Sequence, residues 1–145
     1  IVPVVRADLA RWLSLGLHWL AASVVEVRGL EALRMGSSIV YALPRRSDGS
    51  CLYLDGFKCF IYPVRPLVCE LFPYAYSSSR DDVGLHPWAS SNCEAAKRGL
   101  VELDERERGR LLAIARTLSR ELRSVDENRE DYERMIAEAS GESSL

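Results

Sequence analysis

Residues 51–73, CLYLDGFKCFIYPVRPLVCELFP, decide the fold expected for this chain, because they combine three of its four cysteines with three of its six prolines. The segments CLYL and KCFIY favour two short strands, and the Asp55–Gly56 pair between them is a common hairpin turn. Pro63 and Pro66 must end the second strand, since proline has no N–H to donate to a ladder. Pro66 suits the first position of a short helix over LVCELF, which the next proline closes.

Helical patterns flank this segment on both sides. Upstream, residues 6–20 place apolar side chains at helical spacing, with Gly16 bending or ending the helix, and residues 38–44 favour a strand. Downstream, residues 110–122 carry one apolar stripe, and a capping box at Ser124 predicts the start of a second helix that ends near Gly141. Residues 75–92 are predicted to form a long surface loop. We therefore expect an α+β fold, mainly helical, with a small cysteine-bearing hairpin and loop packed between helices.

The length of 145 residues predicts a single domain, 1–145. We divide it into N-terminal helices and strand (1–50), a cysteine-rich core (51–93) and C-terminal helices (94–140). The formal net charge of −2 argues against nucleic acid as a partner. The longest apolar stretch, residues 12–27, is interrupted by a glycine, a histidine and serines and is shorter than the roughly 18 to 20 residues of a membrane span, which favours a buried helix pair. No secretion signal is visible, so we expect a cytoplasmic protein.

The cysteines are the main candidates for a functional site. Cys51, Cys59, Cys69 and Cys93 lie within a 43-residue window, separated by seven, nine and 23 residues, whereas the predicted apolar helices contain none. They lie beside turns and prolines, where the backbone can be held rigid. Four thiolates that converge there would suit tetrahedral zinc or a 4Fe–4S cluster, because soft sulfur ligands favour both.

Other interpretations of these cysteines remain open. Two disulfides are possible, in any of three pairings. One thiol could be a nucleophile, although neither histidine, His18 nor His86, is adjacent to a cysteine in sequence. The cysteines could also be inert residues of the core. His86 is a further candidate ligand, His18 is expected in the core, and Arg65 is a candidate for offsetting thiolate charge or for binding loop carbonyls.

The order of residues in 51–73 resembles the central motif of the YkgJ-like family of zinc- or iron-chelating domains, also named for a Cys-x-x-Cys-x-x-Cys-Cys signature. The matching positions are Cys51, Leu54, Gly56, Cys59, Ile61, Tyr62, Arg65, Pro66, Cys69, Phe72 and Pro73. The opening VPVVRADLARWLSLGL is similar to the segment that follows the double cysteine in family members. The eponymous signature is absent here, and by the resemblance it would lie just upstream of Ile1. Either the sequence is incomplete at its N-terminus, in which case further cysteine ligands are expected there, or this member has lost part of the site.

The resemblance implies a metal-binding protein with a structural, electron-transfer or metal-handling role. It implies Cys51, Cys59, Cys69 and Cys93 as ligands of zinc or an iron–sulfur cluster, with Tyr62 and Arg65 beside the cofactor. One alternative is a protein methyltransferase-like enzyme, since some family members are described as flagellin lysine methylases, but no glycine-rich methyl-donor loop is visible. Another is an adaptor whose helices over residues 101–140 dock on a protein partner. The sequence leaves open whether the protein is an enzyme.

Overall fold

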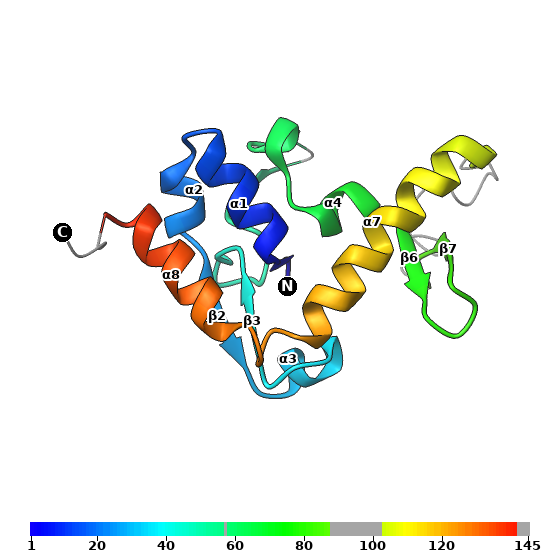
Figure 1. Ribbon diagram of the computed structural model, residues 1–145. Coiled ribbons are helices and arrows are strands. Elements are labelled where there is room, and N and C mark those ends of the chain that lie inside the picture. The colour runs from blue at the N-terminus through cyan, green and yellow to red at the C-terminus, as the bar shows by residue number, and fades with distance from the viewer. Residues whose placement is uncertain (57, 88–102, 142–145) are drawn as a thin grey trace. The chain divides into compact units, whose positions relative to one another are not determined.

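The computed structural model describes residues 1–56, 58–87 and 103–141 (Figure 1). Helices and short antiparallel strands make up the described elements, which confirms the predicted α+β class. The chain divides into two compact units, one of residues 1–66 with 120–145 and one of residues 67–119. Among the described residues, no helix combines the length and apolar character needed to cross a membrane.

The first unit contains a three-stranded sheet, a small hairpin and most of the helices. Its elements are β1 (Pro3–Val4), α1 (Arg6–Ser14), α2 (His18–Ala22), β2 (Val25–Arg28), α3 (Leu30–Met35), β3 (Ile39–Ala42), β4 (Leu54–Asp55), β5 (Lys58–Cys59), the 3-10 turn η1 (Tyr62–Val64) and α8 (Arg129–Ala139). The last turn of α7 (Glu105–Arg123) also belongs to this unit.

The sheet has β3 at its centre, in the order β1-β3-β2, with both neighbours antiparallel to it. All four residues of β3 are buried, as expected for a central strand in a short run of β-branched and aromatic residues. The turn before β3 requires a glycine at position 36. Gly36 has φ 112°, and a Cβ there would lie 2.9 Å from the Cγ of Arg123.

Aromatic side chains form the centre of the core. Tyr41 on β3 and Tyr132 on α8 stack with ring centroids 4.6 Å apart and planes 7° apart. Trp12 on α1 is fully buried in the same cluster. Burial raises the pKa of Tyr132 above its ordinary value. These three side chains join the sheet to helices from both ends of the chain.

The N-terminal helix pattern is confirmed with two differences. Asp8 lies in the first turn of α1, where its Oδ2 accepts the Val5 N–H at 3.0 Å, and Gly16, with φ 76°, separates α1 from α2. The predicted helix pair over residues 12–27 is wrong in its last part, because residues 25–28 pair with β3 instead. His18 was expected in the core but lies exposed at the start of α2.

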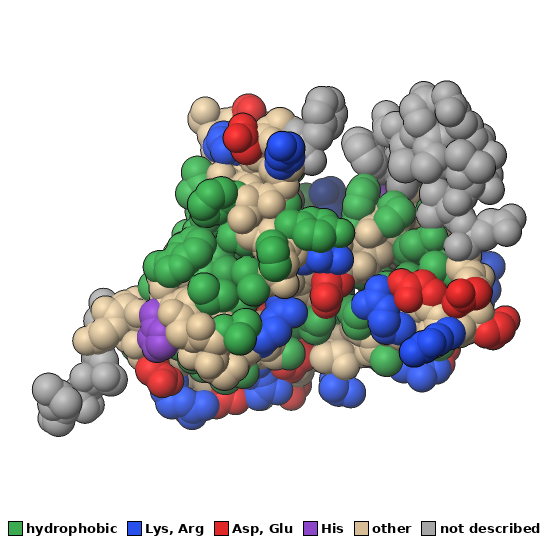
Figure 2. Space-filling view, turned by 90° about the horizontal axis from the view of Figure 1, so that it is seen from above, with side chains coloured by type: hydrophobic (Ala, Val, Ile, Leu, Met, Phe, Trp, Pro, Cys, Tyr) green, Lys and Arg blue, Asp and Glu red, His purple; other side chains and the backbone are tan. Residues whose placement is uncertain are grey.

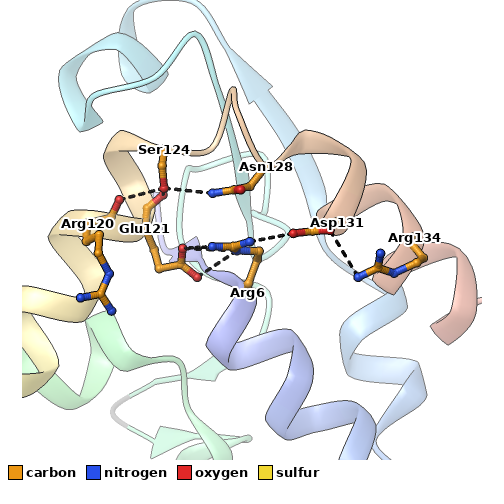
Figure 3. A network of polar contacts seen from close by, with 7 residues as sticks. All are labelled: Arg6, Arg120, Glu121, Ser124, Asn128, Asp131 and Arg134. Atoms are coloured by element: carbon orange, nitrogen blue, oxygen red, sulfur yellow. Dashed lines mark hydrogen bonds and ion pairs between the residues drawn. The ribbon is translucent and has the colours of Figure 1, made fainter.

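Arg6 connects α1 to both C-terminal helical segments, as Figure 3 shows. Its guanidinium donates to both carboxylate oxygens of Glu121 on α7, the shortest bond being 2.8 Å, and to Asp131 Oδ2 on α8 at 2.7 Å. The Arg6 side chain is 30% exposed and that of Glu121 only 10%. A bidentate pair of this kind is among the stronger polar contacts in proteins. Arg6 therefore fixes three helical segments relative to one another within the first unit.

The predicted capping box at Ser124 is wrong, since α8 begins at Arg129 with Asn128 as its N-cap residue. The Ser124 hydroxyl donates back to the carbonyl of Arg120 at 2.9 Å and accepts from Asn128 Nδ2 at 3.1 Å. Asp126 accepts the N–H of Ser38 at 2.9 Å and its hydroxyl at 2.7 Å, so the turn is fixed to the segment before β3. The apolar stripe of α8 over residues 132–139 and its end before Gly141 are confirmed.

The second unit contains α4 (Leu67–Leu71), β6 (Tyr74–Ser77), β7 (Asp82–Leu85) and most of α7. The predicted loop over 75–92 is wrong up to residue 85, because β6 and β7 form an antiparallel hairpin; residues 88–92 lie outside the described residues. Asp81, at φ 47°, turns the chain between the two strands. The stripe predicted on α7 is confirmed, with Leu111, Ala115 and Leu118 buried.

Charged contacts hold the β6–β7 turn to α7. Arg116 donates from Nε and Nη2 to the two carboxylate oxygens of Asp81, at 3.0 and 2.6 Å, and the Tyr76 hydroxyl donates to Asp81 Oδ1 at 2.6 Å. Arg108 donates to Asp82 Oδ1 at 3.0 Å and to the Val83 carbonyl at 3.1 Å. Arg116, followed by Tyr76, lowers the pKa of Asp81 from 3.8 to about 2.

We expect Arg6→Ala to lower the free energy of unfolding by about 2 kcal/mol, because it leaves the nearly buried Glu121 carboxylate without its charged partner. Arg134→Ala is the matched control, since Arg134 also pairs with Asp131 but its side chain is 69% exposed. That control is expected to cost less than about 0.5 kcal/mol. Urea denaturation of the two variants measures the difference, and equal losses would contradict the role given to Arg6.

We expect Asp81 to titrate with a pKa of about 2, as measured by NMR of its carboxyl carbon. Because the folded-state pKa is below the ordinary value, the stabilisation from this pair is present above that value and is lost as the pH falls from 3.8 toward about 2. Arg116→Gln should raise the pKa of Asp81 more than Tyr76→Phe does. Arg108→Gln should raise the pKa of Asp82 and leave that of Asp81 unchanged, whereas a shift of Asp81 there would contradict the assignment.

Candidate functional site

The turn before the hairpin fixes the backbone of Cys51. Arg46 donates from Nη1 to the carbonyl of Cys51 at 2.6 Å and from Nη2 to that of Leu52 at 2.9 Å. The Asp48 carboxylate accepts the N–H and the hydroxyl of Ser50 at 2.9 and 2.6 Å, which closes the turn. Cys51 also forms an isolated antiparallel bridge with Arg45. The first predicted ligand therefore lies on a backbone held from several directions.

The predicted hairpin at Asp55–Gly56 is confirmed, with strands of two residues each. Cys59 in β5 pairs with Leu54 in β4. The Leu54 N–H donates to the Cys51 carbonyl at 3.1 Å, which ties the first cysteine to the strand that pairs with the second. On the same hairpin, the Tyr53 ring meets Trp19 of α2 edge to face, with centroids 5.9 Å apart. The hairpin is therefore attached to the helical part of its unit.

Helix α1 holds the loop that follows Cys59. Trp12 donates from Nε1 to the carbonyl of Val64 at 2.8 Å. Arg11 donates from Nη2 to the carbonyls of Val64 at 3.3 Å and Arg65 at 2.6 Å. Pro63 and Pro66 make this loop stiff, and the two α1 side chains satisfy the carbonyls that the turn leaves without partners. Sequence reasoning missed Arg11 and Trp12, because donors 52 to 54 residues away from their acceptors give no local pattern. It also missed Arg46, which is close in sequence but belongs to no periodic motif.

Arg65 binds within its own loop. Its Nη1 donates to the Tyr62 carbonyl at 2.9 Å, and its guanidinium lies 4.1 Å from the centroid of the Tyr62 ring. Of the two roles predicted for Arg65, the binding of loop carbonyls is thus observed. The cation–π contact also orders Tyr62, whose side chain is otherwise exposed.

The structure places Cys51 and Cys59 in the same unit. Both are partly buried and pack against the main core cluster. The three described cysteines, Cys51, Cys59 and Cys69, form no disulfide with one another. Within residues 1–56, 58–87 and 103–141, no group of three or more Cys, His, Asp or Glu side chains comes close enough to hold a metal ion. The four-cysteine site stays a prediction.

The remaining candidate ligands lie elsewhere in the chain. Cys69 is on α4, in the second unit, where it is partly buried. His86 follows β7 and is exposed, with its backbone N–H donating to the Pro73 carbonyl at 2.8 Å. Cys93 lies outside the described residues. Of the four predicted cysteine ligands, the structure therefore places two in one compact unit.

The cysteine-bearing hairpin and the helices α1 and α2 of the same unit carry exposed apolar side chains. Figure 2 shows hydrophobic side chains gathered where α1, α2 and the hairpin lie. The exposed large apolar residues of these segments are Leu15, Trp19, Leu52, Leu54, Phe60 and Tyr62. Phe60, which follows Cys59 directly, is the most exposed at 76%. The density of aromatic residues beside the turns was the sequence signal for this surface.

Comparison with known proteins adds no relative. No protein-family model matches the chain, and the comparisons with curated proteins and with solved structures gave no match. The resemblance of residues 51–73 to the YkgJ-like motif therefore stays a prediction.

We expect Trp12→Phe to loosen the loop over residues 62–65, because it removes the indole donor to the Val64 carbonyl. The free energy of unfolding should fall by about 1–2 kcal/mol, and exchange of the Val64 and Arg65 amide hydrogens should accelerate more than that of β3 amides. Trp19→Phe is the control, since the Trp19 side chain is half exposed and meets the Tyr53 ring of the hairpin rather than the loop over residues 62–65. Equal acceleration in both variants would contradict the role of Trp12.

Proposed function

We propose that this chain is a metal-binding protein that uses cysteine thiolates to hold zinc or a 4Fe–4S cluster. Cys51 and Cys59 are the ligands with the most structural support, and Cys69 and Cys93 are the further ligands expected from the sequence. The resemblance of residues 51–73 to a metal-chelating family motif points the same way. Its role would be structural, electron-transferring or metal-handling.

One observation carries this proposal: side chains from outside the hairpin fix the backbone at Cys51 and the loop that begins three residues after Cys59, and both thiols are partly buried and form no disulfide with each other. Arg46 binds the carbonyl of Cys51, and α1 binds the loop after Cys59 through Arg11 and Trp12. A ligand pair gains affinity when the chain around it is ordered before the metal arrives.

The chemistry of the donors fits the proposed cofactors in part. Two thiolates are half of a tetrahedral Cys₄ set, which both zinc and a 4Fe–4S cluster use. A bound metal would favour the deprotonated thiolates and neutralise their charge. Arg65 binds the Tyr62 carbonyl and lies over the Tyr62 ring. We therefore propose that Arg65 and Tyr62 hold the conformation of the loop beside the cofactor.

The two alternative functions have less support. For an adaptor that docks through residues 101–140, an unused apolar face would be needed on the C-terminal helices. Tyr132 of α8 is instead buried, and Met135, Ile136 and Ala139 pack against the core of their own unit. For a methyltransferase-like enzyme, the described residues include a cavity of about 200 Å³ lined by Tyr41, Glu26 and Glu133 among others. This one cavity is smaller than the pockets of about 300–1,000 Å³ typical of small-molecule and cofactor sites, so it does not by itself favour an enzyme.

Cys51→Ser and Cys59→Ser should each weaken metal binding at least about 100-fold, since even residues behind the ligands contribute 10–100-fold. In each variant, purified anaerobically, we expect less bound metal by elemental mass spectrometry. The thermal unfolding midpoint should fall together with the metal content. Visible absorption in the unmodified protein distinguishes a cluster from zinc, since only the cluster absorbs there.

Leu52→Ser is the matched control, because Leu52 is an exposed neighbour of Cys51 that carries no thiol. It should leave the metal content unchanged. The proposal would be refuted if the protein, purified anaerobically and then reconstituted with zinc or with iron and sulfide, contained no metal. It would also be refuted if both cysteine variants kept the metal content of the unmodified protein.

A further inference from the structure

Strand β2 has an unpaired edge. It is the last strand in the order β1-β3-β2 and pairs with β3 over residues 25–28. On the other side of an edge strand, alternate N–H and C=O groups point outward and can bond to another strand. In the described part of the chain, no residue outside the sheet forms a hydrogen bond with the backbone of residues 25–28. This edge can therefore accept a fourth strand.

The side chains of β2 are accessible and charged. Glu26 and Arg28 lie on the same face by strand alternation, with side chains 43% and 56% exposed. They form an ion pair along the strand, with Arg28 Nη2 3.3 Å from Glu26 Oε2. Val25 and Val27 lie on the opposite face, and Val25 is 43% exposed. Acid and base thus alternate with valines on a short edge strand.

The pattern Val-Glu-Val-Arg is complementary to itself when two copies run antiparallel. A twofold axis perpendicular to the extended sheet passes through one residue that then faces its own copy. If the axis passes through Glu26 or Arg28, two like charges face each other, which is destabilising. If the axis passes through Val27, Glu26 of each copy faces Arg28 of the other copy. This register alone gives two opposite-charge pairs and a valine pair.

We propose that β2 pairs antiparallel with β2 of a second copy of this chain, with Val27 on the twofold axis. Each charge then has an opposite charge both along its own strand and across the interface. The interface is isologous, so the same edge serves both copies.

The surroundings of Glu26 favour an incoming arginine. Glu26 lines a cavity together with Tyr41 of β3 and Glu133 of α8. The nearby cation, Arg129, already donates from Nε to Glu133 Oε1 at 3.0 Å. Each of the two carboxylates has one arginine in its own chain, Arg28 for Glu26 and Arg129 for Glu133. A carboxylate can accept more than one charge-assisted hydrogen bond, so Arg28 of the second copy would be a second opposite charge for Glu26.

Helix α3 adds apolar surface next to the strand. A single residue, Gly29, separates it from β2, and it packs against both β2 and β3. Its Leu30 and Leu33 side chains are 62% and 61% exposed. Apolar surface beside a strand edge adds to the stability of strand pairing, because four residues of ladder give a small interface by themselves.

The test is the oligomeric state of the full chain in reducing buffer, measured by sedimentation equilibrium over a range of concentrations. The unmodified chain is expected to dimerise. Glu26→Arg and Arg28→Glu should each raise the dimer dissociation constant about tenfold or more, because each places two like-charge pairs across the axis. An equimolar mixture of these two variants should associate again as a heterodimer, since every cross-strand pair then has opposite signs. The double variant E26R/R28E should dimerise as the unmodified chain does.

Glu107→Arg and Arg110→Glu are the matched controls, because they reverse the charges of an exposed ion pair on α7. They should leave the dissociation constant unchanged. An unmodified chain that stays monomeric up to about 1 mM would overturn the proposal and would mean that the edge charges only prevent pairing. If neither β2 variant changes the dissociation constant of the dimer, the interface lies elsewhere and the proposal is wrong. If the mixture of the two variants does not form a heterodimer, the Val27 register is wrong. The double variant and circular dichroism separate these results from misfolding.

Discussion

The guanidinium of Arg6 joins parts of the chain that are more than 110 residues apart in sequence. It binds Glu121 at the end of α7 and Asp131 in α8, while Trp12, less than two turns further along α1, is buried against the sheet. A planar guanidinium can satisfy two carboxylates at once with little further loss of side-chain freedom. Because Glu121 is almost completely buried, this contact determines where the last turn of α7 lies in the first unit. The apolar stripe of α8 can then close over Tyr41.

The other end of α1 connects this core to the cysteine-bearing segment. Arg11 and Trp12 bind carbonyls of the loop over residues 62–65, and the loop begins three residues after Cys59. One helix thus organises the core at its first residue and the candidate site through two residues of its second half. Because Arg11 and Trp12 are hydrogen-bonded to the loop backbone, a shift of α1 would also displace the loop. The stiffness of the site therefore depends on the same helix that assembles the core.

Sequence patterns predicted the elements whose signals are local. The hairpin at Asp55–Gly56, the break at Gly16 and the stripes of α7 and α8 follow from turn chemistry and from 3.6-residue periodicity. The β6–β7 hairpin was missed because its turn contains Arg80 and a left-handed Asp81 rather than the Asn-Gly or Asp-Gly pair usual in short hairpins. Ser124 has the sequence of a cap, but its hydroxyl bonds to the preceding helix and Asp126 bonds to Ser38. Such tertiary contacts, like those of Arg11 and Trp12 at the site, leave no periodic trace in the sequence.

The extent of the apolar core limits what a bound metal would contribute. Small metal domains that unfold without their ion lack a sufficient core, so metal binding supplies most of their folding energy. The first unit instead buries Trp12, Tyr41 and Tyr132 completely, and Cys51 and Cys59 lie at the margin of that cluster rather than at its centre. The sheet and α8 therefore have their own source of stability. A metal held by these thiolates would add stability to a hairpin and loop that are already ordered, and its removal would destabilise that segment before the core.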